Sequence, residues 1–223
     1  MNIQEEIRKV KLASPNLQSQ TEESRNSALA QIVTALRENK ESILSANKED
    51  MEAAVSEGIA AAILGRLKFD EKKLEDVITG IQDLIRLPDP LFHTQLAREL
   101  DEGLTLYRES CPIGVIGVIF EARPDALVQI STLCLKSGNC VILKGGSEAL
   151  RTNRALFKVI SEAVKVAGMP ENCMLQLEAR DEIRELLSCY NSVDLLIPRG
   201  SNSFVQYIMN NTKIPVMGHA DGI

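Results

Sequence analysis

The chain has 223 residues, of which 44% are hydrophobic and 25% charged, and this composition excludes a disordered or collagen-like protein. Its 25 Lys and Arg residues against 31 Asp and Glu residues give a net charge of −6, which argues against a nucleic acid as partner. The longest apolar run, residues 115–120, is far shorter than the roughly 18 residues of a membrane span, and the first six residues do not resemble a signal peptide. We therefore expect a cytoplasmic protein that binds neither nucleic acid nor a membrane.

The cysteines predict reduced thiols rather than disulfides. Their number, five, is odd, no pair has the C-x-x-C spacing, and most stand among apolar neighbours. Since the chain has only two histidines, a metal site is not expected either. We expect most of these thiols to fill the core: Cys111, Cys134, Cys140, Cys173 and Cys189.

Residues 1–90 show the periodicity of amphipathic helices. One apolar stripe consists of Leu29, Ile32, Val33 and Leu36, and a second of Leu74, Val77, Ile78, Ile81, Leu84 and Ile85. Asp70 is suited to cap the second helix at its amino end, and the prolines at 88 and 90 to end it. We expect these helices to pack on a core and to carry no chemistry.

A β-hairpin is expected after the helices. Residues 95–100 and residues 104–108 have the composition of strands, and they flank the turn residues 101–103. The hairpin therefore separates the helical first part of the chain from the second half.

Beyond Pro112, short apolar runs alternate with amphipathic stretches of helical length. The expected strands are residues 115–120, 140–143, 174–177, 193–197 and 214–217, and the expected helices are residues 124–136, 148–167, 181–187 and 201–211. This alternation is typical of right-handed βαβ units, so it predicts an α/β fold with a doubly wound parallel sheet. Ligands of such sheets bind at the carboxyl ends of the strands, and the residues just after each strand are therefore the candidate site.

The first strand is followed by Arg123. Pro124 suits the first position of a helix, which places Arg123 beside a helix amino end that favours anions. Arg123 is therefore a candidate ligand for phosphate or carboxylate. The alternative is an ion pair with Glu121 or Asp125 on a solvated loop.

The second strand is followed by Lys144, Gly145, Gly146, Ser147 and Glu148. Glycines let a backbone approach a ligand closely, the lysine adds a positive charge, and the next helix would offer its first N–H groups to an anion. The pattern indicates a nucleotide pocket, although it is neither a Walker A loop nor a G-x-G-x-x-G fingerprint. A plain Gly-Gly turn is the alternative.

The fourth strand is followed by Arg199, Gly200 and Ser201, which combine a cation, a small residue and a helix-capping hydroxyl. A capped helix with a surface arginine is the alternative, but two such loops on one sheet favour a shared site. His219 follows the last strand in a glycine-rich turn, where a histidine is more often a hydrogen-bonding residue than a catalyst.

Four segments together resemble the γ-glutamyl phosphate reductases, also called glutamate-5-semialdehyde dehydrogenases, of the aldehyde dehydrogenase superfamily. They are GVIGVIFEARPDA at 114–126, ILKGGSEA at 142–149, LLIPRGSNSFV at 195–205 and KIPVMGHADGI at 213–223. The resemblance implies an NADPH-binding domain of the aldehyde dehydrogenase type over residues 1–223. This domain would include a helical region at 1–90 and a hairpin used in oligomerisation at about 95–110.

The resemblance also implies a reaction in proline biosynthesis. L-Glutamyl 5-phosphate would be reduced by NADPH to L-glutamate 5-semialdehyde with release of phosphate, through a cysteine thiolate and a thioacyl intermediate. In this family the cysteine lies in a catalytic domain after the GHADGI segment, whereas this chain ends at Ile223. We therefore expect no catalytic residue and no activity in these 223 residues alone. The implied partners are the acyl phosphate, further copies in a homo-oligomer, and a functional coupling to glutamate 5-kinase.

The resemblance assigns roles to individual residues. It implies one cofactor loop formed by Lys144, Gly145, Gly146, Ser147 and Glu148, and a second formed by Gly200 and Ser201, which Arg199 joins. Many family members have a lysine where this chain has Ser147.

The loop after the first expected strand is assigned to the substrate by the same resemblance. Arg123 is the candidate substrate-binding residue, and Ala122 stands where general aldehyde dehydrogenases have an asparagine that donates to the thioacyl oxygen. Two alternatives remain: a non-catalytic nucleotide-binding or assembly module, and another aldehyde dehydrogenase. The E-A-R-P sequence of this loop argues against the latter.

Overall fold

The computed structural model describes residues 2–179 and 181–218. Its first part is helical, as the periodicity predicted: α1 (Ile3–Gln18), α2 (Glu22–Glu38), α3 (Lys40–Ser56), α4 (Ala61–Leu67) and α5 (Glu71–Arg86). Asp70 caps α5, because its carboxylate accepts the backbone N–H of Lys73 at 3.1 Å, and the helix ends at Arg86, just before Pro88. None of the helices in the described part of the chain is long and apolar enough to cross a bilayer.

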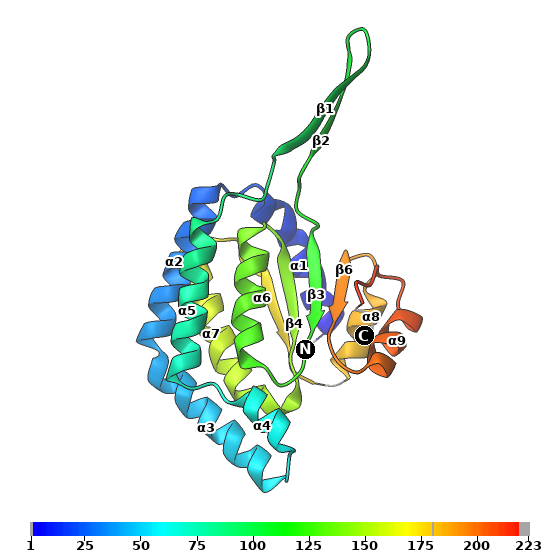
Figure 1. Cartoon of the computed structure of the whole chain (residues 1–223). Helices are drawn as coiled ribbons and strands as arrows, with labels where there is room; N and C mark the ends of the chain where they lie inside the picture. The colour runs from blue at the N-terminus through cyan, green and yellow to red at the C-terminus, as the bar shows by residue number, and fades with distance from the viewer. Residues whose placement is uncertain (1, 180, 219–223) are drawn as a thin grey trace.

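The hairpin extends away from the rest of the molecule (Figure 1). It consists of β1 (Thr94–Asp101) and β2 (Leu104–Glu109), which pair in antiparallel fashion. Gly103 in the turn has φ +75°, a conformation that glycine adopts without steric cost. Nearly all residues of both strands are exposed, so the hairpin adds little to the core.

The sheet is parallel and has the strand order β5-β4-β3-β6. Its strands are β3 (Val115–Ile119), β4 (Cys140–Lys144), β5 (Met174–Leu177) and β6 (Leu195–Pro198). The connecting helices are α6 (Pro124–Lys136), α7 (Leu150–Val166) after the short 3₁₀ turn η1 (Ser147–Ala149), α8 (Glu182–Ser188), and α9 (Asn202–Asn210) after β6. The predicted α/β fold with a doubly wound parallel sheet is confirmed.

Helices cover both faces of the sheet. In Figure 1, α6 and α7 lie over one face with α2 and α5 outside them, and α1 lies behind the sheet, where it contacts β4 and α8. Every residue of β3 and β4 is buried, which explains why these strands read as continuous apolar runs rather than as alternating ones.

The prediction of a full fifth strand at residues 214–217 is wrong. This segment makes a single bridge between Val216 and Leu196 of β6, supported by backbone bonds from Leu196 to Pro215 at 2.9 Å and from Met217 to Leu196 at 2.8 Å. Pro215 has no N–H to donate, so the ladder does not extend through it among the described residues. The strand predicted at 193–197 is observed as Leu195–Pro198.

Three of the cysteines fill the core as expected. Cys134, Cys140 and Cys173 are buried, and burial raises the pKa of the first two thiols to about 12 and that of Cys173 to about 11. Such thiols stay protonated at neutral pH and are poor nucleophiles. Cys189 is half-buried and Cys111 is exposed.

A buried carboxylate joins the helical first part to α7, the helix that follows β4. Asp50 of α3 is 2% exposed, and its carboxylate accepts the backbone N–H and the hydroxyl of Thr152 at 2.8 and 2.7 Å. It also accepts the backbone N–H of Arg151 at 3.3 Å. A side chain of α3 therefore satisfies the first amides of α7.

Asn47, one turn earlier in α3, extends this connection. Its amide group donates to the carbonyl of Leu67 at 2.9 Å and to the Thr152 hydroxyl at 3.2 Å, and its oxygen accepts the backbone N–H of Phe69 at 2.8 Å. The end of α4 is thereby held against α3 and the start of α7.

Replacing Asp50 with alanine should lower the free energy of unfolding by about 3 kcal/mol, because the variant leaves buried donors of Arg151 and Thr152 without an acceptor. Glu52→Ala on the same helix is the control, because Glu52 is exposed and lies 3.9 Å from Lys48. Urea unfolding followed by circular dichroism measures both variants. Equal losses for the two variants would contradict a structural role of Asp50.

Candidate functional site

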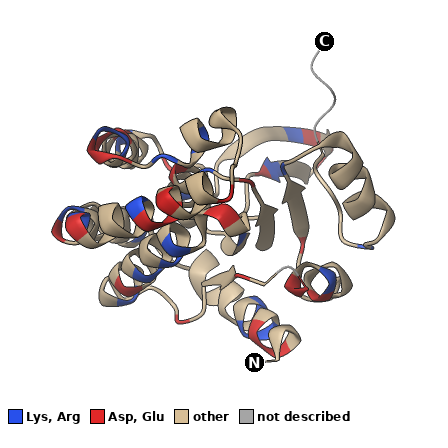
Figure 2. Ribbon diagram, turned by 90° about the horizontal axis from the view of Figure 1, so that it is seen from below, with Lys and Arg blue, Asp and Glu red and all other residues tan. Residues whose placement is uncertain are grey.

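The strand order predicts the place of a ligand at the edge formed by the carboxyl ends of the strands. The chain runs from β3 to β4 and β5 on one side and then returns to β6 on the other side of β3, so the order reverses between β3 and β6. Ligands of open α/β sheets bind at such a point, beyond the carboxyl ends of the strands. Figure 2 shows the molecule from the side of this edge, with basic and acidic segments interspersed over the helices.

Backbone bonds bring the loops after β3, β4 and β6 together. Phe120 donates its N–H to the carbonyl of Lys144 at 2.9 Å, and Arg199 donates its N–H to the carbonyl of Ile119 at 2.7 Å. The three loops that the sequence singled out as chemically interesting are therefore neighbours at the same edge.

Lys144 ends β4 and is almost completely buried, with 6% of its surface exposed. Its ammonium group donates to the carbonyl of Gly145 at 2.6 Å. Burial lowers the pKa of this amine, while the carboxylates of Glu182, Glu148 and Glu178 act in the opposite direction. Lys144 is thus a positive charge embedded among acidic residues rather than one projecting into solvent.

Of the two glycines that follow Lys144, Gly145 packs against a buried side chain, whereas Gly146 meets only the end of the flexible Glu148 side chain. A Cβ atom at Gly145 would lie 2.3 Å from Nδ2 of Asn153, and Asn153 is only 2% exposed. A Cβ atom at Gly146 would lie 2.2 Å from Oε1 of Glu148. Oδ1 of Asn153 is buried and has no hydrogen-bond partner among the described residues, so an unsatisfied acceptor lies directly beside this loop.

The start of α7 differs from the expectation. The amides of Arg151 and Thr152 do not await an external anion, because the Asp50 carboxylate already accepts them. The exposed Ser147 lies before them, in the 3₁₀ turn. A ligand at this loop would therefore meet the segment from Gly145 to Glu148 rather than the first turn of α7.

The loop after β6 opens α9 in the expected way. The hydroxyl of Ser201 accepts the backbone N–H of Phe204 at 3.3 Å, which is the geometry of a helix cap. A Cβ atom at Gly200 would lie 3.1 Å from the Phe204 ring and 3.3 Å from Oε1 of Glu121, so this loop touches the loop after β3. His219 lies outside the described residues.

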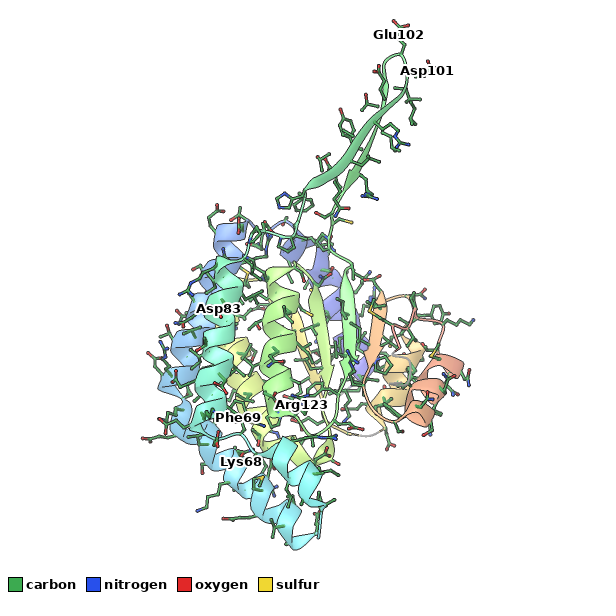
Figure 3. All side chains as sticks on the ribbon, viewed as in Figure 1. Lys68, Phe69, Asp83, Asp101, Glu102 and Arg123 are labelled. Carbon is green, nitrogen blue, oxygen red and sulfur yellow. The ribbon has the colours of Figure 1, made fainter. Side chains whose placement is uncertain are left out.

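Arg123 lies at the amino end of α6 (Figure 3), with 61% of its side chain exposed. Its guanidinium is 3.3 Å from the Asp125 carboxylate, so one of the two alternative ion pairs exists. The other candidate partner, Glu121, pairs with α4: its carboxylate lies 3.7 Å from the guanidinium of Arg66. The Asp125 side chain is only 12% exposed and its Oδ1 is buried with no hydrogen-bond partner among the described residues, so Arg123 neutralises a largely buried carboxylate while most of its own side chain stays exposed.

The helical first part also contributes to this edge, which the sequence pattern does not indicate. A cavity of about 560 Å³ lies between α3, α4 and the loops after β3 and β4, and its lining includes Arg66, Glu121, Ser147, Glu148 and Arg151. Residues 50–66 carry no motif that points to it. Only the packing of α4 on α3 and of α3 on α7 reveals the cavity.

Solved structures share this fold over the whole chain. The crystal structure of γ-glutamyl phosphate reductase from Thermotoga maritima has a TM-score of 0.92 and 32% sequence identity, and the match covers 97% of this chain and 53% of that one. The Saccharomyces cerevisiae structure of the same name has a TM-score of 0.92 and 39% identity, over 100% of this chain and 57% of that one.

Curated sequences are more similar still. Relatives named γ-glutamyl phosphate reductase are 56% identical over 223 residues in Acetivibrio thermocellus and 55% identical over 223 residues in Pelotomaculum thermopropionicum. Both matches include 100% of this chain but 52% and 51% of the relative, so the chain spans about half the length of the curated relatives it matches.

The family model described as "Aldehyde dehydrogenase family" matches residues 1–217. Membership of this family implies a nicotinamide cofactor. The residues at the sheet edge fit such a group, because a backbone segment without side chains at Gly145 and Gly146, an unsatisfied acceptor on Asn153 and the buried Lys144 charge lie together there. From its first helix to the bridge beside β6, the chain belongs to the aldehyde dehydrogenase family.

Proposed function

We propose that this chain is the cofactor-binding part of a γ-glutamyl phosphate reductase. The proposed reaction is the NADPH-dependent reduction of L-glutamyl 5-phosphate to L-glutamate 5-semialdehyde and phosphate, a step of proline biosynthesis in the cytoplasm. The observation that supports it most strongly is the 55–56% identity to relatives of that name over the whole chain. NADPH supplies the hydride when it is bound.

The residues at the sheet edge have separate roles in this proposal. The cofactor contacts the segment from Lys144 to Glu148 and the segment from Arg199 to Ser201. Lys144 provides a positive charge at the end of β4, and the capped start of α9 provides N–H groups to the cofactor. Arg123 binds an anionic group of the substrate, either its phosphate or its carboxylate.

The thiols among the described residues do not suit the role of nucleophile. Cys134, Cys140 and Cys173 are buried with raised pKa values, and Cys111 and Cys189 precede β3 and β6 rather than following them. Residues 1–223 accordingly serve as the NADPH-binding domain, and the attacking cysteine belongs to the part of the family's length that this chain does not span.

The hairpin supports a second role, in assembly. Leu100, Leu104, Leu106 and Tyr107 are each about half exposed or more on a two-stranded element that has no core of its own. Isolated hairpins are marginally stable, so contact with a further copy would stabilise this one. We therefore assign residues 95–110 to homo-oligomerisation. An acyl phosphate substrate also requires a kinase that acts on glutamate, which is the basis for a functional coupling to glutamate 5-kinase.

Calorimetric titration of the 223-residue chain should show binding of NADPH that is tighter than binding of NADH. Lys144→Met keeps the apolar stem but removes the charge, and it should weaken binding of both nucleotides at least tenfold. Lys48→Met on the exposed surface of α3 is the matched control. Absence of binding by the unmodified chain would contradict a preformed cofactor site.

Arg123→Ala should raise KM for the acyl phosphate about tenfold to a hundredfold, because a charge-assisted hydrogen bond to the substrate is lost. The assay uses an enzyme that carries this chain within the full length of its relatives. Arg86→Ala at the end of α5 is the control, because this arginine is 77% exposed and pairs with Asp83 on the same helix. The reverse reaction should require phosphate, and oxidation of the semialdehyde without phosphate would instead favour an ordinary aldehyde dehydrogenase.

Replacing both Leu104 and Leu106 with serine should shift the oligomer toward smaller species, because the double variant loses exposed apolar surface of the hairpin. Light scattering after gel filtration measures the mass, with Leu12→Ser as the control for an exposed leucine outside the hairpin. An unchanged mass in the double variant would exclude the hairpin from the interface.

A further inference from the structure

Asp125, in the first turn of α6, is a buried carboxylate with few partners. The residue is 8% exposed, and Oδ1 of its carboxylate is buried without a hydrogen-bond partner among the described residues. Oδ2 accepts one hydrogen bond, from Nη2 of Arg123 at 3.3 Å. Because burying a carboxylate with so few donors costs free energy, the stability of the fold does not explain this residue.

Asp50 shows how a stabilising buried carboxylate is satisfied in the same chain. It accepts two backbone N–H groups and a hydroxyl at the start of α7. Asp125 also lies at the start of a helix, but its carboxylate accepts no backbone N–H from any residue that the structure describes. A capping role therefore does not account for Asp125 either.

The backbone of Arg123 is fixed on both sides. Its N–H donates to the carbonyl of Glu121 at 2.7 Å, its carbonyl accepts the N–H of Ala126 at 3.0 Å, and Pro124 follows it. The long side chain is the part that a partner still has to hold in place. Within residues 2–179 and 181–218, Asp125 is the one residue that makes a hydrogen bond or an ion pair with this side chain.

The two side chains of the pair differ in exposure. The Arg123 side chain is 61% exposed, whereas that of Asp125 is 12% exposed. A guanidinium has five N–H donors, and the hydrogen bond to Asp125 uses one of them. The buried carboxylate thus holds one corner of the guanidinium, and the other donors of Arg123 remain available to a ligand anion.

The other ion pair of this edge lacks such an anchor. Arg66 and Glu121 lie 3.7 Å apart, and their side chains are 56% and 55% exposed. Pairs between two exposed side chains fix neither partner firmly. Of the exposed arginines in these two pairs, Arg123 is the one that a buried carboxylate holds.

We propose that Asp125 is the positioning residue for Arg123, and thereby for the anionic group of the acyl phosphate substrate. Its carboxylate holds the guanidinium in one orientation before the substrate binds, so binding does not have to order a long side chain. This inference rests on the proposed function, in which Arg123 contacts the substrate. It adds that substrate affinity depends on a buried carboxylate that does not itself touch the substrate.

The sign of the effect on KM separates this role from the opposite one. A carboxylate that did not position Arg123 would weaken substrate binding, because it repels an anion and competes for the guanidinium. Removing its charge would then lower KM. Removing the charge of a positioning residue raises KM instead.

The test is a double-mutant cycle on Asp125→Asn and Arg123→Ala, in an enzyme that carries this chain within the full length of its relatives. Asparagine keeps the size and shape of the side chain and removes its charge. The matched cycle is Asp83→Asn and Arg86→Ala on α5, an arginine–aspartate pair 3.1 Å apart whose side chains are 63% and 77% exposed. Figure 3 shows Asp83 well up α5, away from Arg123.

Asp125→Asn should raise KM for the acyl phosphate about fivefold and change kcat by less than about twofold, because binding rather than the chemical step loses support. In the Arg123→Ala background it should raise KM no further, because the group that it positions is gone. The affinity for NADPH, measured by calorimetry, should stay unchanged in every variant, and the Asp83–Arg86 cycle should leave KM unchanged. Circular dichroism establishes that each variant is folded.

Four results would overturn the inference and leave the role of Arg123 intact. In Asp125→Asn they are an unchanged KM, a lowered KM, a loss that adds fully to that of Arg123→Ala, and a parallel loss of NADPH affinity, which indicates a structural defect. If Arg123→Ala itself leaves KM unchanged, the proposed substrate contact fails and this inference fails with it. If the unmodified enzyme does not reduce the acyl phosphate, the proposed function fails.

Discussion

The buried carboxylate of Asp50 connects the two parts of the molecule. It accepts two backbone amides and a hydroxyl at the start of α7, while Asn47 binds the backbone on either side of Lys68. These groups are buried, so separating α3 from α7 would leave several donors without acceptors, at a cost comparable to a large part of a domain's net stability. The position of α4, and of Arg66 on it, therefore depends on this contact.

The two ends of the sheet are built differently. At the amino end, Asp194 accepts the backbone N–H of Val115 at 2.8 Å and pairs with Lys11 at 2.7 Å, so α1, β3 and the start of β6 are tied together. At the carboxyl end, the loops contain glycines, and the exposed side chains of Arg66 and Arg123 pair with Glu121 at 3.7 Å and with Asp125 at 3.3 Å. Because the Asp50 network also lies at this end, beside the start of α7, the segments that carry the exposed arginines are held on a firm support.

The surfaces proposed for assembly and for ligand binding also lie at opposite ends. The hairpin turn at Asp101 and Glu102 lies far from Arg123 in Figure 3, and the hairpin joins the domain at the amino end of β3. A surface that recruits a further copy at that end does not cover the loops after β3, β4 and β6. The two proposed roles are thus compatible in one chain.

The order and type of nearly all elements could be predicted from the sequence. Helix caps such as Asp70, the prolines after α5 and the buried apolar runs of β3 and β4 are local signals, and local signals are readable without a fold. The strand expected at 214–217 was wrong because one backbone donor, absent in Pro215, decides whether a ladder continues. The loops with Arg123, Lys144 and Arg199 could be singled out as candidates because each follows a strand.

The surroundings of those loops depend on tertiary packing. Asp50 and Arg151 are about a hundred residues apart in the chain, and no periodicity indicates that a carboxylate of α3 occupies the amides at the start of α7. The same long-range packing places Arg66 beside Glu121, and both residues line the cavity together with Ser147. Contacts between distant segments depend on how complete helices pack on the sheet, so they are a property of the folded chain and not of any short stretch of its sequence.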